Sequence, residues 1–169
     1  MKTTAATGPP LDFASWYTAE LPRMCRALTL ATGSVGLGEE AAAEAFARAL
    51  ASWERVGRMD APGAWVYTVA LNEVRRSWRR GLLERRYVER LRDEHMDPPA
   101  EPDDALWRAV AALPPRARTV IALRYVADLP EARVADIMNI SRGTVAATLS
   151  TARRRLAAAL VPTLEEAAR

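Results

Sequence analysis

Cysteine, histidine and lysine are nearly absent from this sequence of 169 residues, which holds one of each: Cys25, His95 and Lys2. A single cysteine cannot form an intramolecular disulfide. One cysteine and one histidine also fall short of the four ligands of a structural zinc site. We therefore expect no disulfide framework, no metal site and no cofactor. We interpret Cys25 as structural, because a reactive thiolate needs a base or a resolving partner.

Long apolar runs are missing too. No stretch approaches the ~20 apolar residues that cross a bilayer. Residues 1–10 lack the apolar run of a secretory signal, so we expect a cytoplasmic protein. The glycines form no phosphate-binding loop, and the scarcity of histidine and cysteine leaves little with which to build a catalytic site. We expect a protein that is not an enzyme.

Arginine is abundant, because it supplies all but one of the 24 basic residues. The formal net charge is only +3, but eight arginines fall between Arg75 and Arg92. A planar guanidinium makes bidentate contacts with phosphate groups and with guanine. A GC-rich genome also favours arginine, so composition alone does not separate a nucleic-acid partner from codon usage.

An acidic segment follows the arginines directly. Residues 93–104 hold six acidic residues, three prolines and no lysine or arginine. Such a segment neither continues a helix nor buries itself in a core. We predict a linker at 93–103 between two domains at 12–92 and 104–160, with tails at 1–11 and 161–169.

Apolar residues recur at helical spacing in both parts, and no segment alternates as a strand does, so the predicted class is all-α, with two small helical domains. In the first part, Phe13–Ala31 predicts one or two helices, because Pro22 is expected to break or kink the segment. Ala42–Trp53 carries the apolar face of a further helix, and another begins near Pro62.

The helix after Pro62 has a second, polar face. Asn72, Arg75, Arg76 and Arg79 stand at i, i+3, i+4 and i+7, which gathers them into one row that we name the arginine ridge. This ridge suits contacts with nucleic-acid phosphates. A solvated basic face without a partner is the alternative.

The second part predicts four helices, and the last two are separated by a three-residue turn. The predicted segments are Leu106–Leu113, Val120–Val126, Pro130–Met138 and Arg142–Leu160. A short helix, a tight turn and a longer helix opened by a capping serine, here Ser141, is typical of a helix-turn-helix DNA reader. Arg142 and Thr144 would then face base edges in the major groove. An ordinary pair of packed helices is the alternative.

The second part closely resembles region 4 of extracytoplasmic-function sigma factors, which belong to the sigma-70 family. The resemblance lies in Leu113–Tyr125, Leu129–Val145 and Leu149–Leu156. In the first part, Glu39–Leu50 is similar to the family's polymerase-docking helix, and Ala64–Asn72 resembles its promoter-melting and recognition helix. The two blocks occur in the family's order.

The resemblance implies a sigma factor that binds core RNA polymerase and promoter DNA and performs no covalent chemistry. It makes the arginine ridge and four further residues candidate DNA contacts: Arg142, Thr144, Arg153 and Arg154. It makes three residues candidate polymerase contacts: Glu40, Glu44 and Phe46. It also implies a base-binding pocket in the loop Glu54–Asp60, beside Trp53 and Trp65, although tryptophans at helical spacing more often belong to a core. An anti-sigma factor is left open as a further partner.

The recognition helix departs from the family pattern. Ala146, Ala147 and Thr148 stand where relatives commonly carry lysine, serine and arginine. Each missing base contact removes about 1–3 kcal/mol of discrimination, so we expect weak or unusual binding of the upstream promoter element. Two alternatives stay open: a helix-turn-helix regulator that binds DNA without polymerase, and a protein-interaction module with a degenerate recognition helix.

Overall fold

The structure, a computed structural model, describes residues 12–88 and 105–167. Every regular element in these two ranges is helical, which confirms the all-α prediction. The elements are α1 (Phe13–Thr32), α2 (Val35–Ala51), α3 (Trp53–Val56), α4 (Pro62–Val88), α5 (Ala105–Ala111), α6 (Pro115–Ile121), the π-helix η1 (Ala122–Val126), α7 (Glu131–Met138) and α8 (Arg142–Ala167). The predicted linker at 93–103 and the tail at 1–11 lie outside the described residues.

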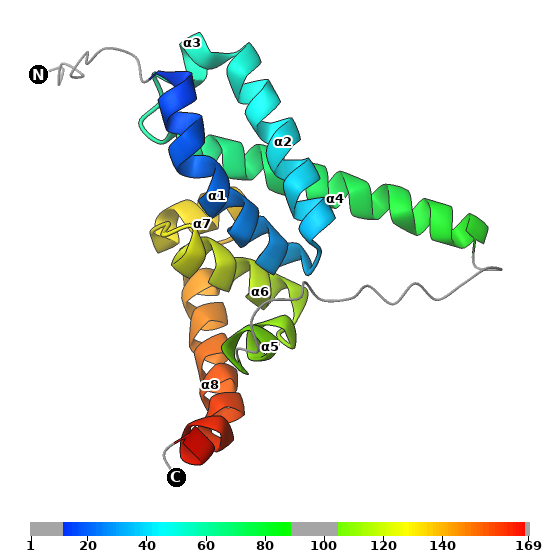
Figure 1. Ribbon diagram of the computed structural model, residues 1–169, viewed down its shortest axis with the longest axis vertical. Coiled ribbons are helices and arrows are strands. Elements are labelled where there is room, and N and C mark those ends of the chain that lie inside the picture. The colour runs from blue at the N-terminus through cyan, green and yellow to red at the C-terminus, as the bar shows by residue number, and fades with distance from the viewer. Residues whose placement is uncertain (1–11, 89–104, 168–169) are drawn as a thin grey trace, which may run out of the picture.

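Helices α1 and α2 form a tight antiparallel pair, and α2 packs in turn against α4 (Figure 1). Gly33 ends α1 in the left-handed conformation, with φ at 76°, and its N–H donates to the Thr29 carbonyl. Ser34 then caps α2 by accepting a hydrogen bond from the Leu37 N–H at 3.2 Å. Pro22 lies within α1, which continues as one helix, so the two-helix alternative is not realised.

The small residues of α2 let it approach α1 closely. Ala41, Ala42, Ala45 and Ala49 are all buried. A Cβ atom added at Gly38 would lie 2.8 Å from the backbone nitrogen of Thr29, closer than packed atoms can come. The alanine-rich face of α2 is therefore explained by helix packing.

Aromatic side chains close the end of the first group of helices. The ring centroids of Trp16 and Trp53 lie 4.8 Å apart, and those of Phe13 and Trp53 lie 5.1 Å apart. Phe46 packs edge-on against both Trp16 and Tyr17. Trp53 is thus partly buried and packs against the core with one side, while it also lines an open groove.

Tyr67 is a buried polar side chain on α4. It is 1% exposed, and its hydroxyl has no hydrogen-bond partner in the part of the chain that the structure describes. Burial raises the pKa of this phenol far above its usual range. An unpaired buried donor costs about 1–3 kcal/mol, so Tyr67→Phe is expected to raise the free energy of unfolding by about 1 kcal/mol in urea denaturation. A loss of stability of that size would contradict the prediction.

The second group of helices surrounds the inner face of α8. Val145, Leu149 and Ala152 form this face, and each is at most 1% exposed. Helix α8 continues to Ala167, whereas the sequence prediction ended it at Leu160 and assigned a tail to 161–169. Pro162 lies within α8, and the helix continues past it although a proline removes one backbone donor.

The two groups of helices pack directly on each other. Helix α1 contacts α6 and η1, and α4 contacts α7. Figure 1 shows the end of α1 lying beside α6. Arg118 of α6 crosses this boundary, because its Nε donates to the Ala31 carbonyl at 3.3 Å while its Nη1 donates to the Ala111 carbonyl at 3.0 Å. A cavity of about 190 Å³ lies at the same boundary, with Arg75 and Trp78 of α4 on one side and Arg116 and Met138 on the other.

Candidate nucleic-acid interface

Helices α7 and α8 pack together around the predicted three-residue turn. Asn139 takes the left-handed conformation, with φ at 53°, which asparagine tolerates better than most residues. The Ile140 N–H donates to the Ala135 carbonyl at 3.0 Å and closes the end of α7. The Ser141 hydroxyl accepts a hydrogen bond from the Thr144 N–H at 3.1 Å and so caps the start of α8. The local geometry is that of a helix-turn-helix.

The Ser141 cap gives a direct test of this geometry. Ser141→Ala removes the acceptor for the Thr144 N–H and also the 2.8 Å contact between the two hydroxyls. We expect a loss of about 1 kcal/mol in the free energy of unfolding, measured by urea denaturation. Because the first turn of α8 then frays, DNA affinity should fall as well. Ser150→Ala, an exposed site further along the same helix, is the control and should change neither quantity.

The candidate DNA contacts on α8 fall into two places. Arg142 and Thr144 lie in its first turn, and Arg142 is exposed. Arg153 and Arg154 are exposed about three turns further along. The Arg153 Nε donates to the Tyr125 hydroxyl at 2.8 Å, so this guanidinium is held against η1.

Tyr125 is a residue that the sequence pattern missed. It was placed within an apolar helical segment, but its side chain is 52% exposed. The π-helical turn of η1 shifts the register of the side chains, so helical spacing did not indicate which way Tyr125 faces. The guanidinium of Arg124 lies 5.6 Å from the centre of the same ring.

The depleted positions of the recognition helix are on its surface. Ala146 and Ala147 are exposed, and neither offers a hydrogen-bonding group. The Thr148 hydroxyl donates to the Thr144 carbonyl at 2.7 Å, within the helix itself. The structure therefore leaves Arg142 and Thr144 as the polar side chains at the start of α8.

The side chains of the arginine ridge of α4 point toward different neighbouring helices. Arg75 Nη1 donates to the Asn72 side-chain carbonyl at 2.7 Å, and Arg75 lines the cavity shared with α6 and α7. Arg76 turns toward α2 and pairs with Glu73 at 3.1 Å. Arg79 is exposed. Helical spacing correctly placed these side chains along α4, but tertiary packing separates them.

The candidate polymerase contacts on α2 do not share one environment. Glu40 and Glu44 line an open groove of about 610 Å³ between α2 and α4, together with Arg76 and Arg80. Phe46 is 2% exposed and packs against Trp16. Phe46 therefore supports α2 from the interior, and of the three candidates only Glu40 and Glu44 line the groove at the surface.

The loop before α4 borders a second open groove. Its lining includes Trp53, Arg55 and Arg58, with Asp12 at the N-cap of α1. The guanidinium of Arg55 lies 5.8 Å from the ring centre of Trp65. An aromatic floor with arginines beside it suits the stacking of an unpaired base, although one face of Trp53 is already covered by Trp16.

Three further properties of the described residues concern metal ligands, the single thiol and the apolar character of the helices. Within residues 12–88 and 105–167, no three histidine, cysteine, aspartate or glutamate side chains come together as metal ligands would. Burial raises the pKa of the Cys25 thiol above its usual value, which keeps it protonated and agrees with a structural role. In the same ranges, no helix has the length and apolar character to cross a bilayer.

A capped helix-turn-helix and a separate arginine-bearing helix define an all-helical DNA-binding protein of the kind that acts in transcription. The family model for sigma-70 region 2 matches residues 16–82, and the model for sigma-70 region 4 matches residues 103–156. The chain therefore belongs to the sigma-70 family of RNA polymerase sigma factors, as a member of the extracytoplasmic-function type.

Two known proteins illustrate the relationship. The RNA polymerase sigma-E factor of Streptomyces coelicolor is 32% identical over 120 residues, which cover 69% of this chain and 68% of that protein. The sigma factor RpoE of Bartonella quintana, solved in complex with the anti-sigma factor NepR, has the same fold, with a TM-score of 0.76 and 19% identity. That match covers 88% of this chain and 96% of the RpoE chain.

Proposed function

We propose that this sigma factor binds core RNA polymerase through α2 and contacts promoter DNA through α4 and α8, so that it directs transcription initiation without catalysing a reaction. The observation that carries the proposal is the pairing of a capped helix-turn-helix with an arginine-bearing helix in one chain. Each feature lies in the part that matches a different sigma-70 region. The proposed location is the cytoplasm.

The proposed division of labour follows the two groups of helices. Domain 12–92 would dock on polymerase and hold the downstream element, and domain 104–160 would bind the upstream element, with 93–103 as the linker. In α8, Arg142 and Thr144 would contact base edges, because N-terminal residues of a recognition helix enter the major groove. Arg153 and Arg154 would contact phosphates.

Helix α4 would take the unpaired strand of the downstream element. Asn72, Arg75, Arg76 and Arg79 supply one amide and three guanidinium groups along this helix. Guanidinium groups both neutralise phosphates and stack on bases, which suits a single strand. Glu40 and Glu44 on the neighbouring α2 present exposed carboxylates for a basic surface of the polymerase.

The upstream element is expected to contribute less affinity than the downstream one. The exposed surface of α8 after its first turn is occupied by Ala146 and Ala147, which make no hydrogen bonds to bases or phosphates. An anti-sigma factor is proposed as a further partner because the structurally similar RpoE was solved with NepR.

In vitro transcription with purified core RNA polymerase and genomic DNA tests the proposal. The 5′ ends of the transcripts would be sequenced with and without the full-length protein. Start sites that share paired upstream elements, and that vanish without the protein, are the expected result. An active core that starts at the same sites without the protein would overturn it. Tight binding of duplex operators without polymerase would instead favour the autonomous regulator. The absence of both transcription and duplex binding would favour the interaction module.

A further inference from the structure

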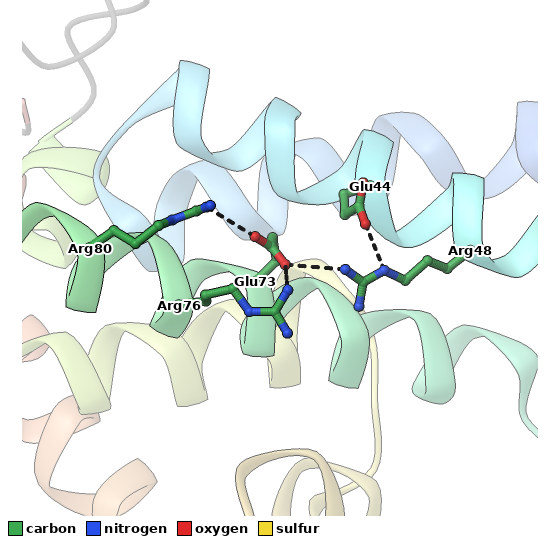
Figure 2. Close-up of polar contacts among 5 residues, drawn as sticks. All are labelled: Glu44, Arg48, Glu73, Arg76 and Arg80. Carbon is green, nitrogen blue, oxygen red and sulfur yellow. Dashed lines mark hydrogen bonds and ion pairs between the residues drawn. The ribbon is translucent and has the colours of Figure 1, made fainter.

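One carboxylate, that of Glu73, receives three guanidinium groups in the groove between α2 and α4 (Figure 2). Arg76 and Arg80 reach it from its own helix at 3.1 and 3.2 Å. Arg48 reaches it from α2 at 3.5 Å. Arg48 is also held by Glu44 at 2.6 Å. We name these five residues the Glu73 network.

The carboxylate lies beneath the guanidinium groups. The side chain of Glu73 is 12% exposed, whereas those of Arg48, Arg76 and Arg80 are 43%, 52% and 58% exposed. An ionised carboxylate has about four lone-pair sites, and three arginines share those of Glu73. Because the carboxylate is shielded from water, it attracts the guanidinium groups more strongly than an exposed acid would.

The position of this carboxylate matters for DNA binding. Arg76 and Arg80 extend along the helix that we propose to hold promoter DNA, and a DNA phosphate must compete with Glu73 for them. Phosphate contacts add affinity for every sequence, whereas base contacts discriminate between sequences. The Glu73 carboxylate therefore weakens the phosphate contacts, which add affinity for DNA of any sequence.

We infer that Glu73 is a specificity-determining residue of this sigma factor, which holds Arg76 and Arg80 in fixed orientations and screens their charge, so that sequence-independent DNA binding stays weak. The inference rests on the proposed function, because it assigns α4 to promoter DNA. Arg48 contributes by tying the carboxylate to α2, so that α2–α4 packing sets where the arginines of α4 lie.

The test compares full-length wild-type protein with Glu73→Gln. The probes are a fluorescein-labelled random-sequence single strand and the corresponding duplex, titrated by anisotropy from low to high NaCl without polymerase. Releasing one or two arginines is expected to raise affinity about 3- to 10-fold at low salt and to steepen the slope of log K against log[NaCl] by about one. The matched control is Glu39→Gln, which changes the net charge equally from an exposed position on α2 outside the network.

Further variants separate screening from a general effect of charge or folding. Glu73→Asp keeps the charge and should restore most of the wild-type salt slope. Arg80→Gln in the otherwise wild-type chain should weaken random-sequence binding less than 2-fold, because Arg80 is already screened. In the Glu73→Gln background, the same substitution should remove most of the affinity that Glu73→Gln gained over wild type. The Arg80→Gln comparison stays informative if Glu73→Gln fails to fold, which circular dichroism would reveal.

The outcomes also distinguish this inference from the proposed function. If Glu73→Gln and Glu39→Gln bind DNA equally, or if Arg80→Gln alone weakens binding 5-fold or more, Glu73 does not screen Arg76 and Arg80. Those results leave transcription by the wild-type protein untouched. Where transcript mapping supplies the promoter strand, Glu73→Gln should also lower the ratio of promoter to random-sequence affinity, and an unchanged ratio would overturn the inference.

Discussion

Replacing Phe46 with alanine is expected to lower the free energy of unfolding by about 3–5 kcal/mol, because it removes a fully buried aromatic side chain. The ring is 2% exposed, and its centroid lies 5.4 Å from that of Trp16 and 4.9 Å from that of Tyr17. Truncation leaves a cavity between α1 and α2 and also removes the aromatic pair energy. For a chain of this length, the melting temperature should fall by roughly 10 °C or more.

Thermal and urea denaturation followed by circular dichroism measure this effect. Phe46→Leu, which keeps much of the volume, should lose about half as much stability. Polymerase affinity at low temperature, where the variant remains folded, should stay within 2-fold of wild type, since the ring does not reach the surface. Unchanged stability combined with lost polymerase binding would show that Phe46 contacts the partner directly.

Phe46 also illustrates what a sequence can indicate about such a site. The family resemblance located the docking helix, and the structure forms α2 at that place. Whether a residue on this helix faces a partner or the core depends on where the aromatic side chains of α1 lie. The spacing of apolar residues along α2 did place Phe46 on the packed face. That physical argument agrees with the structure better than the polymerase contact that the family resemblance implied for Phe46.

Local signals predicted local structure well. Ser141 and Pro62 each act within one turn of their own position, and α8 and α4 begin there. Pro22 and Pro162 behave differently, because neither ends its helix. A proline removes one backbone donor, and in α1 this loss is outweighed by the packing of that helix against α2.

The spacing of residues along a helix did not predict contacts between residues that are far apart in the sequence. The Glu73–Arg76 pair is three residues apart and was visible in principle, but Arg48 reaches Glu73 from 25 residues away. The division of the arginine ridge between two neighbours likewise depends on how α4 packs against α2 and α7. Hydrophobic period indicates which face of a helix is buried, but it does not indicate which helix covers it.

Arg118→Ala is expected to separate the two groups of helices. The guanidinium donates to the Ala31 carbonyl in the last turn of α1 and to the Ala111 carbonyl at the end of α5, which are 87 and 7 residues away along the chain. Both helix C-termini carry partial negative charge that a cation stabilises. Hydrogen bonds to a charged group contribute about 1.5–3 kcal/mol each, so removing the bond across the boundary favours the separated form by roughly 10- to 100-fold.

Small-angle X-ray scattering measures the outcome as a larger radius of gyration, while circular dichroism should show unchanged helix content. Arg116→Ala is the matched control, because this arginine is exposed on the same helix and lines the boundary cavity without a hydrogen bond to the described residues. It should leave the radius near that of wild type, and Arg118→Lys should fall between the two because one ammonium cannot reproduce the forked geometry.

Separation of the two groups of helices is also expected to change DNA binding by α4. In the packed form, Arg75 and Trp78 of α4 line a partly open cavity of about 190 Å³, with residues of α6 and α7 on its other side. Packing of α6 and α7 covers part of Arg75 and Trp78, although Trp78 stays 42% exposed, so the covered part of these side chains becomes available to DNA only when the groups move apart. Arg118→Ala is therefore expected to bind single-stranded promoter DNA several-fold more tightly than wild type, with Arg116→Ala unchanged or slightly weaker through its lost charge. An Arg118→Ala protein as compact as wild type, or one with equal DNA affinity, would mean that the packed arrangement does not limit access to α4.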